Sequence, residues 1–145
     1  MASYERGAML CRQGEPCDSL MYIEHGLVRL AVTTHRGREA TCGLLATGAF
    51  LCEDSVADGH AVHGHTATAT TPTDVIIVAR SQMIRLLRTE PQLADRFIAH
   101  LLERRARLEA DLADQLLHSS EQRLARALVL LAGCEGPQSS TRVLP

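Results

Sequence analysis

Short apolar runs separated by glycine-bearing turns occupy residues 1–80, and this pattern predicts β-strands. One run alternates apolar with other residues, so one face of a predicted strand carries Val28, Leu30 and Val32. The segment THRGRE that follows predicts a hairpin turn in which Gly37 adopts a positive φ. Many short strands without intervening helices indicate a barrel or a jelly-roll-like double sheet, and we expect an antiparallel β-roll.

From Ser81 onward the apolar residues recur at three- and four-residue intervals, which predicts helices. Ser81 is the expected N-cap of a short helix that stops before a proline. Residues 91–118 contain no glycine, have proline only at the first position, and are rich in Leu, Ala, Arg and Glu. They therefore predict one long helix. Ser119 and Ser120 break it, and Ser119 with Gln122 matches a capping box that starts a further helix.

The long helix is the candidate dimer contact. Its 28 residues would extend about 42 Å at 1.5 Å per residue, which exceeds what a domain of this size covers. Part of its apolar stripe is therefore expected to meet a second copy, although the stripe also fits a helix that covers only its own core. Arg105 and Gln115 interrupt the seam. The residues expected at the dimer seam are Phe97, Leu101, Leu108, Leu112 and Leu116.

These patterns predict an α+β protein in three parts. Residues 1–90 form a β-roll with a short helix, residues 91–118 form the long dimerisation helix, and residues 119–145 comprise a hinge, a following helix and a polar linker.

The overall composition adds limits. The 46% hydrophobic and 22% charged content is ordinary for a globular domain, and a net charge of -2 gives no basic field toward nucleic acid. The N-terminus carries charge and lacks a signal-peptide apolar stretch, so we expect a cytoplasmic protein. In that compartment the five cysteines are expected to be reduced thiols.

Residues 10–26, LCRQGEPCDSLMYIEHG, resemble the first signature of cyclic nucleotide-binding domains. The matching features are an initial apolar pair, Gly14, a small residue at Cys17, four apolar residues from Leu20, and Gly26. The order of β-roll, short helix, long helix, serine break and SSEQRLARALVLLA resembles the Crp/Fnr transcription regulators. This resemblance implies a homodimer through the long helix, with Ser119 and Ser120 as hinge. It also implies DNA binding only through a C-terminal helix-turn-helix domain that is not in this chain.

The family's second signature, the phosphate-binding cassette, is altered here. The resemblance places the candidate effector-binding residues at Cys52, Glu53, His65, Thr66 and Ala67. Glu53, Thr66 and Ala67 fit the family pattern. Cys52 stands where the family has glycine, and His65 stands where it has the phosphate-binding arginine.

The missing arginine argues against ordinary cyclic AMP binding. No arginine or lysine lies between Arg38 and Arg80. Imidazole is mostly neutral near pH 7 and does not grip a phosphate with two parallel donors as a guanidinium does. Residues 91–118 also contain no serine or threonine to contact a nucleotide base. A cyclic nucleotide is therefore not expected to bind in the standard way, and the effector stays open.

Histidines near the cassette suggest metal as another ligand. In a strand, residues two apart face the same way, so His63 and His65 are candidates for one ion, with His60 and Cys52 nearby. We therefore hypothesise a metal or haem site in place of the nucleotide site. The alternative is a glycine-bearing loop whose histidines are simply solvated.

Other functions have weaker support. Some Crp/Fnr relatives hold an iron–sulfur cluster with closely spaced cysteines, but Cys11 and Cys17 are separated and fit small buried hydrophobes better. Glu53 and Asp54 are adjacent and face opposite ways in an extended segment, so we expect no enzyme. The remaining alternatives are a stand-alone or degenerate cyclic-nucleotide-binding-like module that acts through dimerisation, and a metal-binding cupin-like protein.

Overall fold

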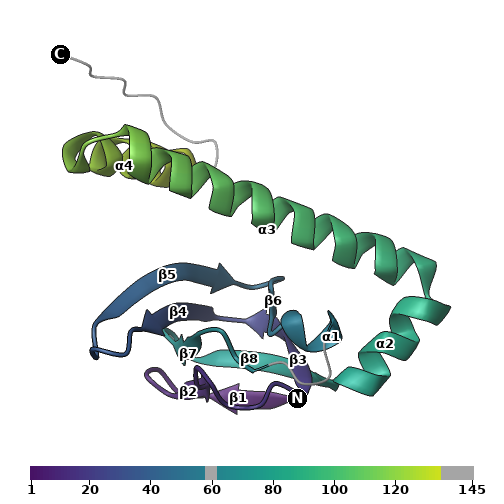
Figure 1. The fold of residues 1–145 in the computed structure, drawn as a ribbon. Helices are drawn as coiled ribbons and strands as arrows, with labels where there is room; N and C mark the ends of the chain where they lie inside the picture. The colour runs from purple at the N-terminus through teal and green to yellow at the C-terminus, as the bar shows by residue number, and fades with distance from the viewer. Residues whose placement is uncertain (58–61, 135–145) are drawn as a thin grey trace. The chain divides into compact units, whose positions relative to one another are not determined.

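The computed structural model describes residues 1–57 and 62–134, and their first part is a roll of two antiparallel sheets (Figure 1). One sheet has the order β1 (Ala2–Tyr4), β8 (Thr73–Ala79), β3 (Ser19–His25) and β6 (Phe50–Leu51). The other has the order β2 (Met9–Cys11), β7 (Thr66–Ala69), β4 (Leu27–Thr33) and β5 (Glu39–Ala46). The short helix α1 (Asp54–Ala57) lies in the chain between β6 and β7. Three helices follow: α2 (Arg80–Thr89), α3 (Pro91–Leu117) and α4 (Ser120–Cys134). The predicted α+β fold with an antiparallel β-roll is confirmed.

The main core lies between the two sheets. Ile23 and Val75 come from the first sheet, Val28 and Leu30 from the second, and all four are at most 2% exposed. Burying one such aliphatic side chain contributes about 1.5–3 kcal/mol. The alternation of β-strand side chains thus fixes which residues of each sheet point inward.

The β4–β5 hairpin contains a β-bulge on β5. The register shifts between Leu30, which pairs with Gly43, and Ala31, which pairs with Thr41. Cys42 is the extra residue, and it is exposed. On β4 itself the pairing with β7 is regular from Val28 to Ala31. Of the predicted face Val28, Leu30 and Val32, the first two are buried and Val32 is only partly buried, while Ala31 is buried as well.

Two connections between consecutive strands use positive φ at glycine. Gly37 has φ of 75°, as predicted, and a Cβ added there would meet no atom within 4 Å. Gly26 joins β3 to β4 with φ of 108°. A Cβ on Gly26 would lie 2.5 Å from Thr73 Oγ1 and 2.6 Å from the Pro72 carbonyl oxygen. Gly26 is therefore required both by conformation and by the close approach of another segment.

The start of α3 packs on the β-roll through a second cluster. Phe97 is 5% exposed and lies with Leu20 and Met83 in this cluster. Its ring meets Phe50 edge to face, with centroids 5.2 Å apart. The prediction that Phe97 belongs to the dimer seam is therefore wrong, because its side chain is used in the chain's own core.

Helix α2 begins two residues earlier than expected, and Ser81 is not its cap. The N-cap is Ala79, which makes no side-chain capping bond. The backbone N–H of Arg80 instead donates to the Asp18 carbonyl at 2.9 Å, and Arg80 Nε donates to the Ser55 carbonyl at 2.7 Å. Arg80 thus links the start of α2 to α1.

The chain divides into two compact units, residues 1–97 and a second unit that starts at Ile98. In the second unit the predicted seam residues on α3 are exposed: Leu101 37%, Leu108 50%, Leu112 57% and Leu116 76%. Helix α4 also carries exposed leucines, including Leu124 and Leu128. This unit therefore presents a large apolar surface within the described chain.

The junction between α3 and α4 is a confirmed capping box. Ser119 Oγ accepts from the Gln122 backbone N–H at 3.4 Å, and Gln122 Oε1 accepts from the Ser119 backbone N–H at 3.1 Å. Arg126 on α4 contacts Asp114 on α3 at 2.7 Å. The serine break thus ends one helix and starts the next, and an ion pair holds the two ends together.

Among the helices that the structure describes, none combines the length and the apolar character that a membrane span requires.

Candidate functional site

The segment that corresponds to the cassette runs from Cys52, directly after β6, to the first residues of β7. Cys52 has φ of 68°, and among the described residues no other side-chain-bearing position has a positive φ. This left-handed conformation costs a non-glycine residue about 1–2 kcal/mol. The Cys52 carbonyl accepts from the Ser55 N–H at 3.1 Å and so starts the turn of α1. The geometry explains why glycine suits this position in the family pattern.

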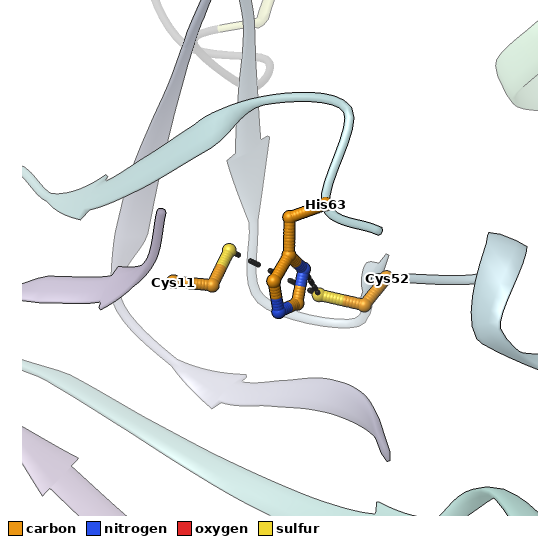
Figure 2. A group of neighbouring side chains, drawn as sticks. All are labelled: Cys11, Cys52 and His63. Atoms are coloured by element: carbon orange, nitrogen blue, oxygen red, sulfur yellow. Dashed lines mark hydrogen bonds between the residues drawn. The ribbon is translucent and has the colours of Figure 1, made fainter. Parts of the chain in front are cut away.

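Two thiols and one imidazole meet beside this turn (Figure 2). Cys52 Sγ donates to Cys11 Sγ at 4.0 Å and lies 3.3 Å from His63 Nδ1. The ligand atoms of all three side chains lie within 4.8 Å of one another. Cys11 is buried in the main core, whereas Cys52 and His63 are partly buried. The sulfur atoms are far from the disulfide bond length of about 2.05 Å, so both thiols are reduced in this arrangement.

Backbone pairing fixes the position of His63. Its N–H donates to the Glu15 carbonyl at 2.9 Å, and its carbonyl accepts from the Gly14 N–H at 2.8 Å. Gly14 has φ of 85°, which makes the turn that brings this segment alongside. Pro16 and Val62 form an isolated bridge next to it. Backbone hydrogen bonds with Gly14 and Glu15 of the first signature thus fix the position of His63 in the cassette segment.

The thiols influence each other's protonation. The Cys52 S–H stabilises a Cys11 thiolate and so lowers the pKa of Cys11 below the ordinary value of 9.0. The pKa of Cys52 is strongly raised by the same hydrogen bond. Burial and the charge that a Cys11 thiolate would carry raise it further. Burial also raises the pKa of Cys17. The two thiols therefore titrate as a pair in two steps, and the second thiolate forms much less readily than the first.

The other predicted site residues lie nearby in different roles. His65 is partly buried, but it does not belong to the three-residue cluster found among the described residues. Its carbonyl accepts from Cys11 Sγ at 4.0 Å. Thr66 Oγ1 accepts from the Gln13 N–H at 3.1 Å, and Ala67 is fully buried opposite Cys11 in the sheet.

The strand expected at His63 and His65 is not present, because β7 begins only at Thr66, and the ligand cluster found among the described residues contains His63 without His65. Both histidines precede it in irregular backbone, where residues two apart need not face the same way. Glu53 is partly buried, and its carbonyl accepts from the Val56 N–H at 3.0 Å within α1. His60 lies outside the described residues.

The sequence prediction of this cluster missed Cys11. It lies 41 positions before Cys52 in the chain, and only the packing of β2 against the cassette turn brings the thiols together. Its place in an apolar pair of the first signature gave the signal of a core residue, which it also is.

Comparison with known proteins gives a consistent picture. Residues 1–90 match the family model described as the cyclic nucleotide-binding domain. The chain is 34% identical over 128 residues to the cyclic AMP receptor protein of Thermus thermophilus, a match that covers 88% of this chain and 58% of that protein. It is 28% identical over 137 residues to a CRP-like cAMP-activated global transcriptional regulator of Mycobacterium tuberculosis, covering 93% of this chain and 60% of the regulator.

Solved structures show the same fold. A CRP-family transcriptional regulator from Thermus thermophilus matches with a TM-score of 0.76 at 25% identity, over 91% of this chain and 64% of that one. The Thermus thermophilus catabolite activator protein matches with a TM-score of 0.66 at 33% identity, over 80% of this chain and 53% of that one. The chain spans less than two thirds of the length of these relatives.

Proposed function

Because the chain belongs to the cyclic nucleotide-binding domain family, we propose that it is the effector-sensing and dimerisation region of a Crp/Fnr-type transcription regulator. The resemblance seen in the sequence is confirmed at the level of the family, and the relatives are transcription regulators. They do not favour a cupin-like metal protein. In this proposal the protein is a homodimer, and DNA is bound by a helix-turn-helix domain that is not among these residues.

The proposed effector is not cyclic AMP bound in the standard way. The observation that carries this is the chemistry of the cassette, where the glycine position holds Cys52 and the arginine position holds His65. The nearest arginine after the cassette, Arg80, already uses its Nε to hold the Ser55 carbonyl. A cyclic phosphate would therefore lack the two-donor cation that balances its charge.

The proposed signal path runs through contacts within the first unit. Ser55 on α1 is fully buried, and its Oγ makes no hydrogen bond within the described residues. Such a hydroxyl costs about 1–3 kcal/mol, which an effector bound beside α1 would offset. Arg80 links α1 to α2, and Phe50, two residues before Cys52, contacts Phe97 at the start of α3.

Movement of the cassette would thus reach α3, and the capping box at Ser119 and Ser120 is the proposed hinge beyond it. The exposed leucines of α3 are the proposed dimer contact, with Leu101, Leu108, Leu112 and Leu116 from the predicted seam. Phe97 is not part of this proposed dimer contact, because it is buried within its own chain.

Titration calorimetry with cyclic AMP tests the effector proposal. The natural chain should show no micromolar binding. A double variant, Cys52→Gly with His65→Arg, restores the family pattern and should gain measurable heat. The control His35→Arg adds the same charge on the exposed hairpin and should gain none. A micromolar isotherm for the natural chain would overturn the proposal.

A further inference from the structure

The side chains of Cys11, Cys52 and His63 converge from three separate segments: the end of β2, the turn before α1 and the loop before β7 (Figure 2). Two features distinguish this cluster from a chance contact between surface side chains, namely the burial of one thiol and the backbone pairing of the histidine. Cys11 is 8% exposed, and His63 is held by two backbone hydrogen bonds to Gly14 and Glu15. The three donor atoms are therefore presented by fixed backbone.

Their spacing fits a small tetrahedral ion. With Zn–S of about 2.3 Å and Zn–N of about 2.05 Å, a tetrahedron has an S···S edge of about 3.8 Å and an S···N edge of about 3.6 Å. The corresponding separations are 4.0 Å between the two sulfur atoms and 3.3 Å between Cys52 Sγ and His63 Nδ1. Each of these two differs from the ideal edge by about 0.3 Å or less. The third separation, between Cys11 Sγ and a His63 ring nitrogen, is within 4.8 Å, and rotation of these side chains would bring it to the ideal edge.

The backbone at Cys52 gives independent support. A cysteine is held in a left-handed conformation with φ of 68°, where glycine would avoid the steric cost. Strain of this kind concentrates at functional sites, because a side chain needed there outweighs the local penalty. The side chain in question is the thiol that touches both other members of the cluster.

We propose that Cys11, Cys52 and His63 bind one zinc ion, with the fourth coordination position left for an external ligand. Two thiolates and one neutral imidazole suit this borderline-soft cation, and the two negative charges balance its charge in the partly buried site. Each thiol releases its proton to solvent as its Zn–S bond forms, and no electron is transferred. Three protein ligands with an open position are typical of zinc sites that also accept a small molecule.

The zinc would act on the sensing region, and in this respect the inference rests on the proposed function. The ion would join β2 to the turn that starts α1 and to the segment before β7. It would thereby fix the cassette in one position, and an effector that takes the open position would have direct access to α1. Zinc would be an integral part of the effector site.

The test uses the whole chain without a histidine tag, purified under reducing conditions and loaded with Zn²⁺ or with Co²⁺ alone. Elemental analysis should find about one equivalent of zinc, and the cobalt form should show a thiolate-to-cobalt charge-transfer band. Cys52→Gly and His63→Asn should each bind less than about a tenth of an equivalent. Cys42→Ser removes an exposed thiol and should bind as the natural chain does. Circular dichroism checks that each variant is folded.

Three results would overturn the zinc proposal. The first is a natural chain that takes up no zinc and shows no thiolate-to-cobalt charge-transfer band. The second is a Cys52→Gly variant that binds as much metal as the natural chain. The third is a metal-free protein whose intact mass is lower by two hydrogen atoms, which indicates a disulfide. Calorimetry with cyclic AMP on the same samples separates the two proposals. Absence of both metal and nucleotide binding removes only the zinc site, whereas micromolar nucleotide binding contradicts the proposed effector chemistry whatever the metal content.

Discussion

Replacing Gly26 with alanine should destabilise the β-roll more than the same replacement at Gly37. Both glycines connect consecutive strands and have positive φ, 108° and 75° respectively, but Gly37 closes the β4–β5 hairpin whereas Gly26 joins strands of the two different sheets. They differ in their surroundings, because a Cβ at Gly37 meets no atom within 4 Å. A Cβ at Gly26 would lie 2.5 Å from Thr73 Oγ1 and 2.8 Å from Thr73 Cα. The pair therefore separates the conformational cost from the steric cost.

The magnitude follows from these two costs. A left-handed conformation costs alanine about 1–2 kcal/mol, and the stiffer unfolded chain returns about 0.4–1 kcal/mol. Both effects apply to each variant, so Gly37→Ala should lose about 1 kcal/mol. At Gly26 the backbone of Pro72 and Thr73 must also shift, which adds about 1–3 kcal/mol of overpacking. The free energy of unfolding should thus fall by about 2–4 kcal/mol in Gly26→Ala.

Urea unfolding followed by far-ultraviolet circular dichroism measures this difference. For a slope of about 2 kcal/mol per molar urea, an extra loss of about 2 kcal/mol lowers the midpoint by about 1 M. Because neither variant changes the proposed dimer contact on α3, both are compared at one protein concentration, at which any dimer contributes equally to their stability. Equal midpoints for Gly26→Ala and Gly37→Ala would refute the argument from close approach.

Three further changes test other parts of the structure. Phe97→Ala should lower the free energy of unfolding by about 3–5 kcal/mol in the same urea assay, because the ring is 5% exposed; a loss below about 1 kcal/mol would contradict its core role. Replacing both Leu108 and Leu112 with aspartate should convert a dimer to a monomer in sedimentation velocity while the dichroism spectrum is retained, since both are at least half exposed in one chain; a persistent dimer would exclude this seam. Iodoacetamide should modify Cys42 at least about tenfold faster than Cys17, whose burial raises its pKa; peptide mass spectrometry reports the rates, and equal rates would contradict the packing.

The elements that sequence predicted well are those set by local chemistry. The turn at Gly37 follows from the positive φ that glycine tolerates, and the capping box from two side chains three residues apart. The order of the strands within each sheet, by contrast, was not predicted. Local rules gave strands but not their neighbours, since pairing depends on contacts between distant segments.

The errors have a common physical cause, which is that tertiary packing overrides local periodicity. On β4, Ala31 is buried although it alternates out of phase with Val28 and Leu30, and Val32 is only partly buried. Phe97 lies on the stripe of the long helix, yet it turns into the chain's own core because the first turns of α3 cover the β-roll. Cys11 and Cys52 are brought together only by the packing of segments that are 41 residues apart, and no spacing rule reaches that far.

The left-handed backbone at Cys52 has a consequence for how such domains diversify. A cysteine codon becomes a glycine codon through a change of its first base, and a histidine codon becomes an arginine codon through a change of its second. Because Cys52 already holds the φ of 68° that glycine adopts readily, either residue fits without a new turn. Two point mutations, at Cys52 and His65, therefore connect a thiol-bearing cassette with the nucleotide-binding pattern on an unchanged backbone.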